Sequence, residues 1–316
     1  MSPLPKVALG TWSWGSGIAG GDQVFGNHLD AATLKPVFEL ALQQGLGLWD
    51  TAAAYGMGSS ESMLGAFVKA SPRSDLILST KFTPQLANPQ SPNPVLEMFE
   101  HSCQRLGTDV IDLYWIHNPT RVNEWTQHLV PLLQSGRCKR VGVSNHNLRD
   151  IKLVNSSLAQ AGFKVSAVQN HYSLLYRSSE QAGILDYCRD NGITFFSYMV
   201  LEQGALSGRY DVSHPLPEGS RRAATYNPVL PQLEQLTDAM RSIGQRKNAS
   251  VAQIAIAWAI AKGTLPIIGV TKPAHVQDAA SAIRIALTAS EMATLETLAA
   301  QAGVDTQGAW ESAMHA

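Results

Sequence analysis

The stretch LKPVFELALQQGLGLWDTA, residues 34–52, places a predicted helix directly before a predicted strand. In residues 34–44, apolar side chains recur at the three-to-four-residue spacing that gathers them on one face of a helix. Gly45 can end this helix, because glycine adopts the left-handed conformation without strain. The following run, LGLWDTA (46–52), is apolar and has the length of a strand. The stretch therefore predicts one helix followed by one buried strand.

Seven further apolar runs along the chain resemble residues 46–52, and most precede a helical pattern. They are VALGTW (7–12), DLILSTKF (75–82), VIDLYWIH (110–117), RVGVSN (140–145), SAVQN (166–170), ITFFSY (193–198) and LPIIGV (265–270). Strands that alternate with helices form parallel sheets with right-handed crossovers. Eight such units over roughly 280 residues fit a closed (β/α)8 barrel, which typically takes about 250 residues. We therefore expect one α/β domain, a (β/α)8 TIM barrel, over residues 1–316.

An open doubly wound sheet is the rival architecture, and it normally carries GxGxxG after its first strand. Here the first run continues as GTWSWGSGIAGGDQ (10–23), which has glycines at other spacings and no helix start.

The least regular stretch is 201–230, whose length favours a functional lid over a linker. Ser250 begins a capping-box pattern, SVAQ, at a helix start. Three further N-caps are expected at Asn147, Ser178 and Thr288.

The composition limits the classes of function. The chain is 45% hydrophobic and 16% charged with a net charge of −1, so we expect a sizeable core and no nucleic-acid or anionic-membrane partner. Cys103, Cys138 and Cys188 lie far apart without a CxxC pattern, which favours reduced thiols in the cytoplasm. Residues 1–10 show no apolar core of a secretory signal. The longest apolar candidate, IAIAWAIA (254–261), is too short to span a membrane and is expected to be a buried helix.

Polar residues stand at the ends of the predicted strands, where a barrel carries its chemistry. They are Asp50 with Tyr55 just beyond it, Lys81, His117, Ser144 with Asn145, Gln169 with Asn170, and Tyr198. Each alone has a structural explanation: an acid can cap a loop, a lysine can pair with it, and a tyrosine or histidine can pack at the rim. Together, the acid, phenol, amine and imidazole predict a catalytic site.

This set of groups suits acid–base chemistry at an oxygen atom. A phenol has a pKa of about 10 and needs a neighbouring cation such as Lys81 to lower it. A carboxylate such as Asp50 can hold that lysine charged and in place. An imidazole such as His117 can orient a substrate oxygen. The set predicts proton transfer to or from an oxygen on carbon while a hydride moves at that carbon.

Several motifs in order resemble the aldo-keto reductase family, from about residue 7 to 298. They are DTAAAYGMGSSESMLG (50–65), STKF (79–82), IDLYWIHNP (111–119), GRCKRVGVSN (136–145), VQNHYSLLYR (168–177) and SYMVLEQGALSGRY (197–210). The last departs from the family at Val200, where proline is usual. The resemblance implies that Tyr55 is the general acid, Lys81 tunes it, Asp50 pairs with Lys81, and His117 orients the carbonyl.

The resemblance also implies a nicotinamide cofactor bound in extended form over the barrel mouth, which explains the missing GxGxxG. Ser144, Asn145 and Gln169 would hold the carboxamide, and Tyr198 would stack on the ring. The other implied cofactor contacts are Gly10, Thr11, Trp12, Asp50, Leu201, Gly204, Leu206, Arg209, Gly269, Thr271, Lys272, His275 and Asp278. Three further departures from the family are His275 for arginine, Ala279 for asparagine and His146 for phenylalanine. Lys272, with the arginines of 201–230, favours NADP(H), and NAD(H) is possible.

The leading interpretation is an enzyme that reduces a small aldehyde or ketone with NADPH. One alternative is a cofactor-binding regulatory subunit of the same fold, such as the potassium-channel β subunits. Another is a Schiff-base enzyme that uses Lys81 as its nucleophile. No metal site is expected, since the histidines form no HxH or HExxH pattern. The physiological substrate is left open, because five aromatic residues could either wall a pocket or pack elsewhere: Trp14, Phe25, Trp125, Tyr226 and Trp310.

Overall fold

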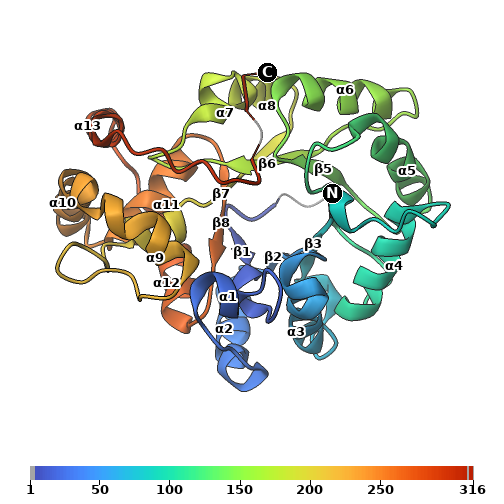
Figure 1. Ribbon diagram of the computed structural model, residues 1–316, viewed down its shortest axis with the longest axis horizontal. Helices are drawn as coiled ribbons and strands as arrows, with labels where there is room; N and C mark the ends of the chain where they lie inside the picture. The colour runs from blue at the N-terminus through green and yellow to red at the C-terminus, as the bar shows by residue number, and fades with distance from the viewer. Residues whose placement is uncertain (1–3, 312, 316) are drawn as a thin grey trace.

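The computed structural model describes residues 4–311 and 313–315. Its strands are β1 (Ala8–Gly10), β2 (Leu48–Asp50), β3 (Ile77–Phe82), β4 (Leu113–Ile116), β5 (Val141–Ser144), β6 (Ala167–His171), β7 (Thr194–Tyr198) and β8 (Leu265–Gly269). They pair in parallel in chain order, and β8 pairs with β1 to close the barrel (Figure 1). Seven of the eight apolar runs contain one of these strands, and the run 166–170 contains all of β6 except its last residue, His171, so the predicted barrel is confirmed.

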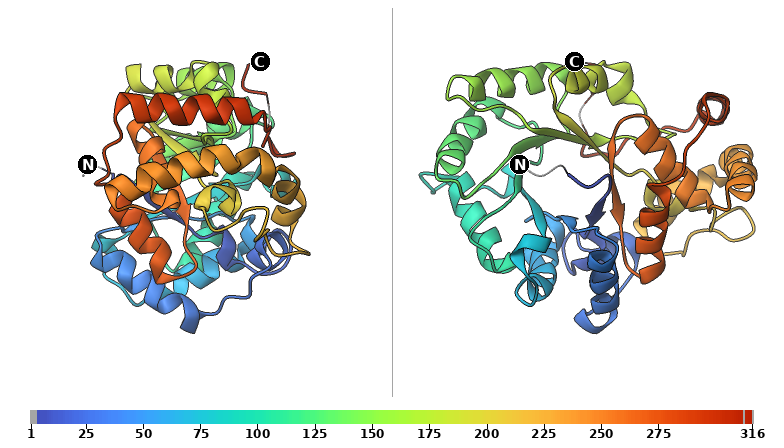
Figure 2. Two further views of the ribbon diagram at one scale, coloured as in Figure 1. Left: turned by 90° about the vertical axis from the view of Figure 1, so that its left-hand side faces the viewer. Right: turned by 180° about the vertical axis from the view of Figure 1, so that it is seen from behind.

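Helices surround the strands on the outside of the barrel (Figures 1 and 2). The longer ones are α2 (Ala31–Gln43), α3 (Ser59–Val68), α4 (Pro94–Leu106), α5 (Val122–Gln134), α6 (Leu148–Ala159), α8 (Ile184–Asp190), α10 (Leu230–Lys247), α11 (Val251–Ala261), α12 (Pro273–Ala282) and α13 (Ala289–Ala302). The short ones are α1 (Gly21–Phe25), α7 (Ser178–Gln181) and α9 (Arg221–Tyr226), with 3-10 turns η1 (Trp12–Trp14), η2 (Tyr55–Gly58), η3 (Arg73–Asp75), η4 (Pro84–Leu86), η5 (Glu202–Ser207) and η6 (Asn227–Val229).

The helix ends follow from local hydrogen bonding. Asn147 caps α6, while Ser250 and Thr288 form complete capping boxes at α11 and α13, as the sequence predicts. The predicted cap at Ser178 is wrong by one residue. Ser178 already lies inside α7, because the carbonyl of Arg177 accepts the first backbone bonds of that helix, from Glu180 and Gln181.

The interior of the barrel is a packed core. Trp115 of β4 meets Phe196 of β7 edge to face, with ring centroids 5.2 Å apart. Gly142 of β5 makes room for Trp115, since a Cβ atom at residue 142 would lie 2.4 Å from that ring. A barrel filled in this way leaves only its carboxyl-terminal rim for chemistry.

Two segments lie at this rim outside the regular β–α units. The stretch 201–230 is folded rather than irregular: η5, α9 and η6 surround a small core that includes Leu216 and Tyr226. The chain after α13 crosses towards the ends of β6 and β7, as the dark red segment in Figure 1 shows. Within the described ranges, no helix is long and apolar enough to cross a membrane.

Candidate active site

A buried ion pair joins the ends of β2 and β3. The Nζ atom of Lys81 donates to Oδ2 of Asp50 at 2.6 Å and to the carbonyl oxygen of Thr51 at 2.8 Å. The other carboxylate oxygen, Oδ1 of Asp50, accepts from Ser79 Oγ at 2.7 Å and Gln169 Nε2 at 3.2 Å. Buried charges need such complete pairing, because nothing else replaces the water that they lose.

Lys81 stays charged in this setting. Burial lowers the pKa of Lys81, but the Asp50 carboxylate and the Tyr55 phenol outweigh that effect, and the pKa lies above its ordinary value. The third contact of Lys81 Nζ is the hydroxyl of Tyr55, at 3.2 Å. A permanent positive charge therefore lies within hydrogen-bond distance of the phenol.

Tyr55 is the first residue of η2, which follows the loop after β2. Its ring lies against Trp12, with centroids 5.8 Å apart and planes inclined by 24°. Burial raises the pKa of the phenol, the charge of Lys81 lowers it, and Asp50 raises it, with a net rise above the ordinary value. The expectation of a net lowered pKa is therefore wrong: Lys81 acts in the expected direction, but burial outweighs it. The phenol holds its proton at neutral pH.

His117 follows β4 and faces the phenol. Its ring centroid lies 6.0 Å from that of Tyr55, at an interplanar angle of 79°. Its Nδ1 atom lies 2.9 Å from the hydroxyl oxygen of Thr83. Burial and the charge of Lys81 lower the pKa of His117 to about 3. The imidazole is thus neutral and carries a single N–H donor.

Amide and hydroxyl side chains from β5, β6 and β7 lie at the same rim. The Tyr198 hydroxyl donates to Asn145 Oδ1 at 2.6 Å, and Asn145 Nδ2 donates to the His117 carbonyl at 3.0 Å. Asn145 takes the left-handed conformation, at φ 63°. Among the described residues, the Ser144 hydroxyl has no hydrogen-bond partner. Asn145 is thus held by the Tyr198 hydroxyl and the His117 backbone, whereas Ser144 has a donor that no described residue accepts.

The turn after β1 brings Gly10, Thr11 and Trp12 to the rim beside Asp50. The Thr11 backbone N–H donates to the Asp50 carbonyl at 3.0 Å, and the buried Thr11 hydroxyl lies 2.9 Å from Ser60 Oγ. The side chain of Thr11 is therefore occupied within the fold. Trp12, by contrast, lies on the Tyr55 ring.

The remaining predicted cofactor contacts come from two segments of the chain. Leu201, Gly204, Leu206 and Arg209 lie in or beside η5, and Gly269, Thr271, Lys272, His275 and Asp278 lie at the end of β8 and on α12. Burial, Lys272 and Arg209 all lower the pKa of His275, to about 4, whereas Asp278 opposes them. The charges of Arg209 and Lys272, which are far apart in sequence, therefore both act on the imidazole of His275. Asp278 is occupied elsewhere, since it accepts from Gln253 Nε2 at 2.7 Å. Leu206 is fully buried.

The aromatic residues separate into two groups. Trp14 and Trp125 lie in the outer core, and Tyr226 is buried below η5, where its hydroxyl donates to Glu202. Phe25 and Trp310 instead meet Trp12 edge to face, with ring centroids at 5.2 and 6.2 Å. Only the second group reaches Tyr55, through Trp12.

Sequence reasoning missed a polar cluster that ties the chain after α13 to the rim. His171, at the end of β6, contacts Glu202 through Nε2 at 2.9 Å and Glu311 through Nδ1 at 2.8 Å. Trp310 Nε1 donates to the Tyr198 hydroxyl at 3.3 Å. No spacing in the sequence signals this cluster, because its contacts join residues that are 31, 112 and 140 positions apart. Thr83 was missed as well, although it stands two residues after Lys81 and thus on the same side of the strand.

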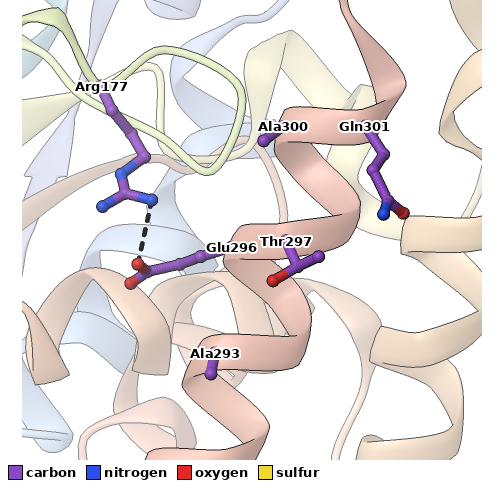
Figure 3. Close-up of a pocket in the computed structure, with 6 residues that line it drawn as sticks. All are labelled: Arg177, Ala293, Glu296, Thr297, Ala300 and Gln301. Atoms are coloured by element: carbon purple, nitrogen blue, oxygen red, sulfur yellow. Dashed lines mark ion pairs between the residues drawn. The ribbon is translucent and has the colours of Figure 1, made fainter.

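A surface pocket on the outer ring holds none of the predicted site residues. It is lined by Arg177, Ala293, Glu296, Thr297, Ala300 and Gln301, mostly along one face of α13 (Figure 3). Arg177 and Glu296 form an ion pair of 2.9 Å across it. The pair satisfies both charges, so the pocket offers no free charge to a ligand.

The rim fits a flat, carboxamide-bearing ring. One face of Tyr198 packs on the His171 ring, with centroids 5.5 Å apart, and no other ring of the described residues stacks on Tyr198. Ser144, at the end of β5, offers a hydroxyl without a partner among the described residues. A Cβ atom added to Gly269, at the end of β8, would meet nothing within 4 Å, so this part of the rim is open. These residues could hold a nicotinamide against Tyr198.

Known proteins resemble this chain over nearly its whole length. A sequence model of the Aldo/keto reductase family matches residues 6–300. The chain is 33% identical to the chloroplastic pyridoxal reductase of Arabidopsis thaliana, over 94% of this chain and 84% of that protein. It is 29% identical to the NADH-specific methylglyoxal reductase of Escherichia coli K12, over 94% and 95%.

Among solved structures, the chain is similar to an aldo/keto reductase from Klebsiella pneumoniae in complex with NADP and acetate. The TM-score is 0.71 at 25% sequence identity, and the match covers 98% of this chain and 95% of that one. The family match spans the barrel and the rim residues from Gly10 to Asp278, but not Trp310 and Glu311. The protein therefore belongs to the aldo/keto reductase family and is an NAD(P)-dependent oxidoreductase.

Proposed function

We propose that this protein reduces an aldehyde or ketone to an alcohol, with Tyr55 as the general acid and NADPH as the preferred cofactor. The observation that carries the proposal is the hydrogen-bonded series from Asp50 through Lys81 to Tyr55, with steps of 2.6 and 3.2 Å. When bound, the nicotinamide would supply the hydride.

The protein side of the reaction follows from the charges in this series. The protonated phenol of Tyr55 donates its proton to the carbonyl oxygen as that oxygen gains negative charge. The Lys81 ammonium then stabilises the phenolate that is left behind, and Asp50 keeps Lys81 charged and in place. In the oxidative direction the same phenolate takes the proton back. The neutral imidazole of His117 donates a hydrogen bond that orients the substrate oxygen.

The proposed preference for NADPH rests on positive charge near the end of β8. Lys272 is exposed at the start of α12, and the positive charges of Lys272 and Arg209 both lower the pKa of His275. A 2′-phosphate would be attracted to this charge. The NADP-bound Klebsiella structure supports the proposal, whereas the NADH-specific E. coli relative leaves NADH as the second candidate.

The proposed substrate is a small carbonyl compound with an apolar or flat body. Trp12, Phe25 and Trp310 supply aromatic surface beside Tyr55. Pyridoxal, which the name of the plant relative gives, is a heteroaromatic aldehyde of this kind. The three cysteines are free and buried, which supports the proposal that the protein works in a reducing compartment such as the cytoplasm.

The test is an assay of nicotinamide absorbance with NADPH or NADH and a panel of carbonyl compounds that includes pyridoxal and methylglyoxal. Steady oxidation of NADPH with at least one aldehyde or ketone is the expected result. Tight retention of cofactor with negligible turnover across the panel would instead favour the regulatory-subunit alternative. The Schiff-base alternative is disfavoured by the ion pair, because an ammonium group is not a nucleophile.

A further inference from the structure

We propose that Thr83 is a positioning residue that fixes the proton of His117 on Nε2, the ring nitrogen left free for the substrate oxygen. The proposal rests on the proposed carbonyl reduction, in which His117 donates a hydrogen bond. It adds a residue that the motifs of the family resemblance did not single out.

Thr83 is held rigidly beside His117. It directly follows β3 and is only 5% exposed. Its backbone N–H donates to the sulfur of Met98 at 3.3 Å, and its carbonyl accepts from Leu86 N at 2.9 Å. The His117 backbone is fixed as well, since its N–H donates to the Phe82 carbonyl at 2.8 Å. The hydroxyl and the ring therefore face each other from two anchored strand ends.

The direction of the hydrogen bond between them follows from the donors and acceptors available. The Thr83 hydroxyl has no other hydrogen-bond partner among the described residues. If His117 donated from Nδ1, the hydroxyl proton of Thr83 would be left without an acceptor in a buried place, which costs free energy. If Thr83 donates, its proton is satisfied and Nδ1 acts as the acceptor. The second arrangement is favoured.

The position of the proton matters because the ring is neutral. A neutral imidazole has one N–H, so a proton on Nδ1 would leave Nε2 as a bare acceptor. Two acceptors, Nε2 and a carbonyl oxygen, cannot form a hydrogen bond with each other. With Thr83 donating to Nδ1, the N–H lies on Nε2, which bonds to none of the described residues. That N–H is then available to the oxygen that receives the proton of Tyr55.

The direct test is the nitrogen NMR spectrum of protein labelled with 15N-histidine, with the His117 signals assigned from His117→Asn. The proposal predicts that His117 in the wild-type protein is protonated on Nε2 throughout the neutral range. Thr83→Val keeps the shape of the side chain but removes the hydroxyl. In this variant, the neutral imidazole of His117 should populate both tautomers, with the proton on Nδ1 or on Nε2. Wild-type signals that show the proton on Nδ1 would overturn the proposal, whatever the activity of the protein.

Kinetics supply a second readout that a purely structural role would not change. Thr83→Val should lower kcat for carbonyl reduction roughly tenfold or more while the Kd for NADPH stays within about twofold. Thr83→Ser restores the donor and should recover most of the rate. The matched control is Thr237→Val on α10, which removes a buried hydroxyl whose hydrogen bonds within the described part of the chain go to the carbonyls of Leu233 and Glu234. Equal kcat in Thr83→Val and Thr237→Val would contradict the proposal.

The two proposals can fail separately. If Tyr55→Phe turns over normally, the proposed general acid is wrong, and the NMR signals of His117 still report on Thr83. If turnover depends on Tyr55 but Thr83→Val changes neither the signals of His117 nor kcat, only the inference about Thr83 is wrong.

Discussion

The Nζ atom of Lys81 lies 2.6 Å from Oδ2 of Asp50, and the two side chains are 0% and 3% exposed. Neither charge meets bulk water, so each depends on the other and on the surrounding donors and acceptors. The same lysine touches the hydroxyl of Tyr55. The stability of this part of the fold and its proposed chemistry therefore share one ion pair.

Asp50→Asn should destabilise the protein strongly. The substitution keeps the shape of the side chain but leaves the buried charge of Lys81 without its partner, which typically costs about 3–5 kcal/mol. The free energy of unfolding, measured by urea denaturation at pH 7, should fall by about this amount. Glu39→Gln is the control, because Glu39 pairs with Lys35 on the exposed surface of α2 and should change stability by less than about 0.5 kcal/mol. Similar small losses in both variants would contradict the account.

His146 should limit the stability of the protein in acid. The residue is fully buried, its Nδ1 donates to the Ser144 carbonyl at 2.7 Å, and its Nε2 has no partner among the described residues. Burial lowers the pKa of His146 to about 4, although the bond to Ser144 opposes this shift. An unfolded histidine has a pKa of about 6.5. The unfolded state therefore binds the proton first, and stability is lost as pH falls from about 6.5 towards 4.

His146→Phe removes this proton linkage. Between pH 7 and pH 4.5 the variant should lose less free energy of unfolding than the wild type, by roughly 2 kcal/mol. Urea denaturation at the two pH values measures the difference. His214→Gln, at a side chain that is 79% exposed, is the control and should follow the wild type. Equal losses in His146→Phe and the wild type would show that His146 does not resist protonation in the fold.

The chain after α13 should detach from the rim at high pH. Burial alone lowers the pKa of His171, but the carboxylates of Glu202 and Glu311 outweigh burial and raise it to about 9. The stability that this charge contributes is complete below about pH 6.5 and is lost as pH rises through about 9. Trp310 reports the change, since its indole N–H donates to the Tyr198 hydroxyl.

The fluorescence of Trp310, isolated by comparison with Trp310→Phe, should change between pH 7 and pH 10. In Glu311→Gln the contact with His171 loses its charge, so the spectrum at pH 7 should already resemble that of the wild type at high pH. A wild-type spectrum that stays constant across this range would contradict the assigned role of His171.

Lys272→Ala should weaken the binding of NADPH more than the binding of NADH. Loss of one cation beside the proposed 2′-phosphate site should raise the Kd for NADPH about tenfold, while the Kd for NADH should change little. Quenching of protein fluorescence measures both constants. Lys164→Ala removes an exposed lysine beside Asn191, away from β8, and serves as the control. Equal losses for both cofactors in Lys272→Ala would remove the basis for the proposed preference.

The strands and the rim were predictable because short apolar runs end in polar residues at barrel positions. Asp50, Lys81 and His117 follow from this pattern alone, and the parallel pairing of β2 with β3 and of β3 with β4 brings them together. The net pKa of Tyr55 was not predictable, since it depends on burial that only the folded chain creates. The contacts of His171 with Glu202 and Glu311 were not predictable either, because no local sequence pattern relates these residues.

In the proposed reduction, the hydroxyl of Tyr55 supplies the proton. Tyr55→Phe removes this oxygen and keeps the ring that lies on Trp12, so cofactor binding should remain near the wild-type level. The decisive measurement is the single-turnover rate of NADPH oxidation with an aldehyde, at saturating concentrations of both, in the wild type and in this variant. From the role of Tyr55 as proton donor, we expect the rate to fall by about 10²-fold or more while the Kd for NADPH is unchanged. An unchanged rate would contradict this role.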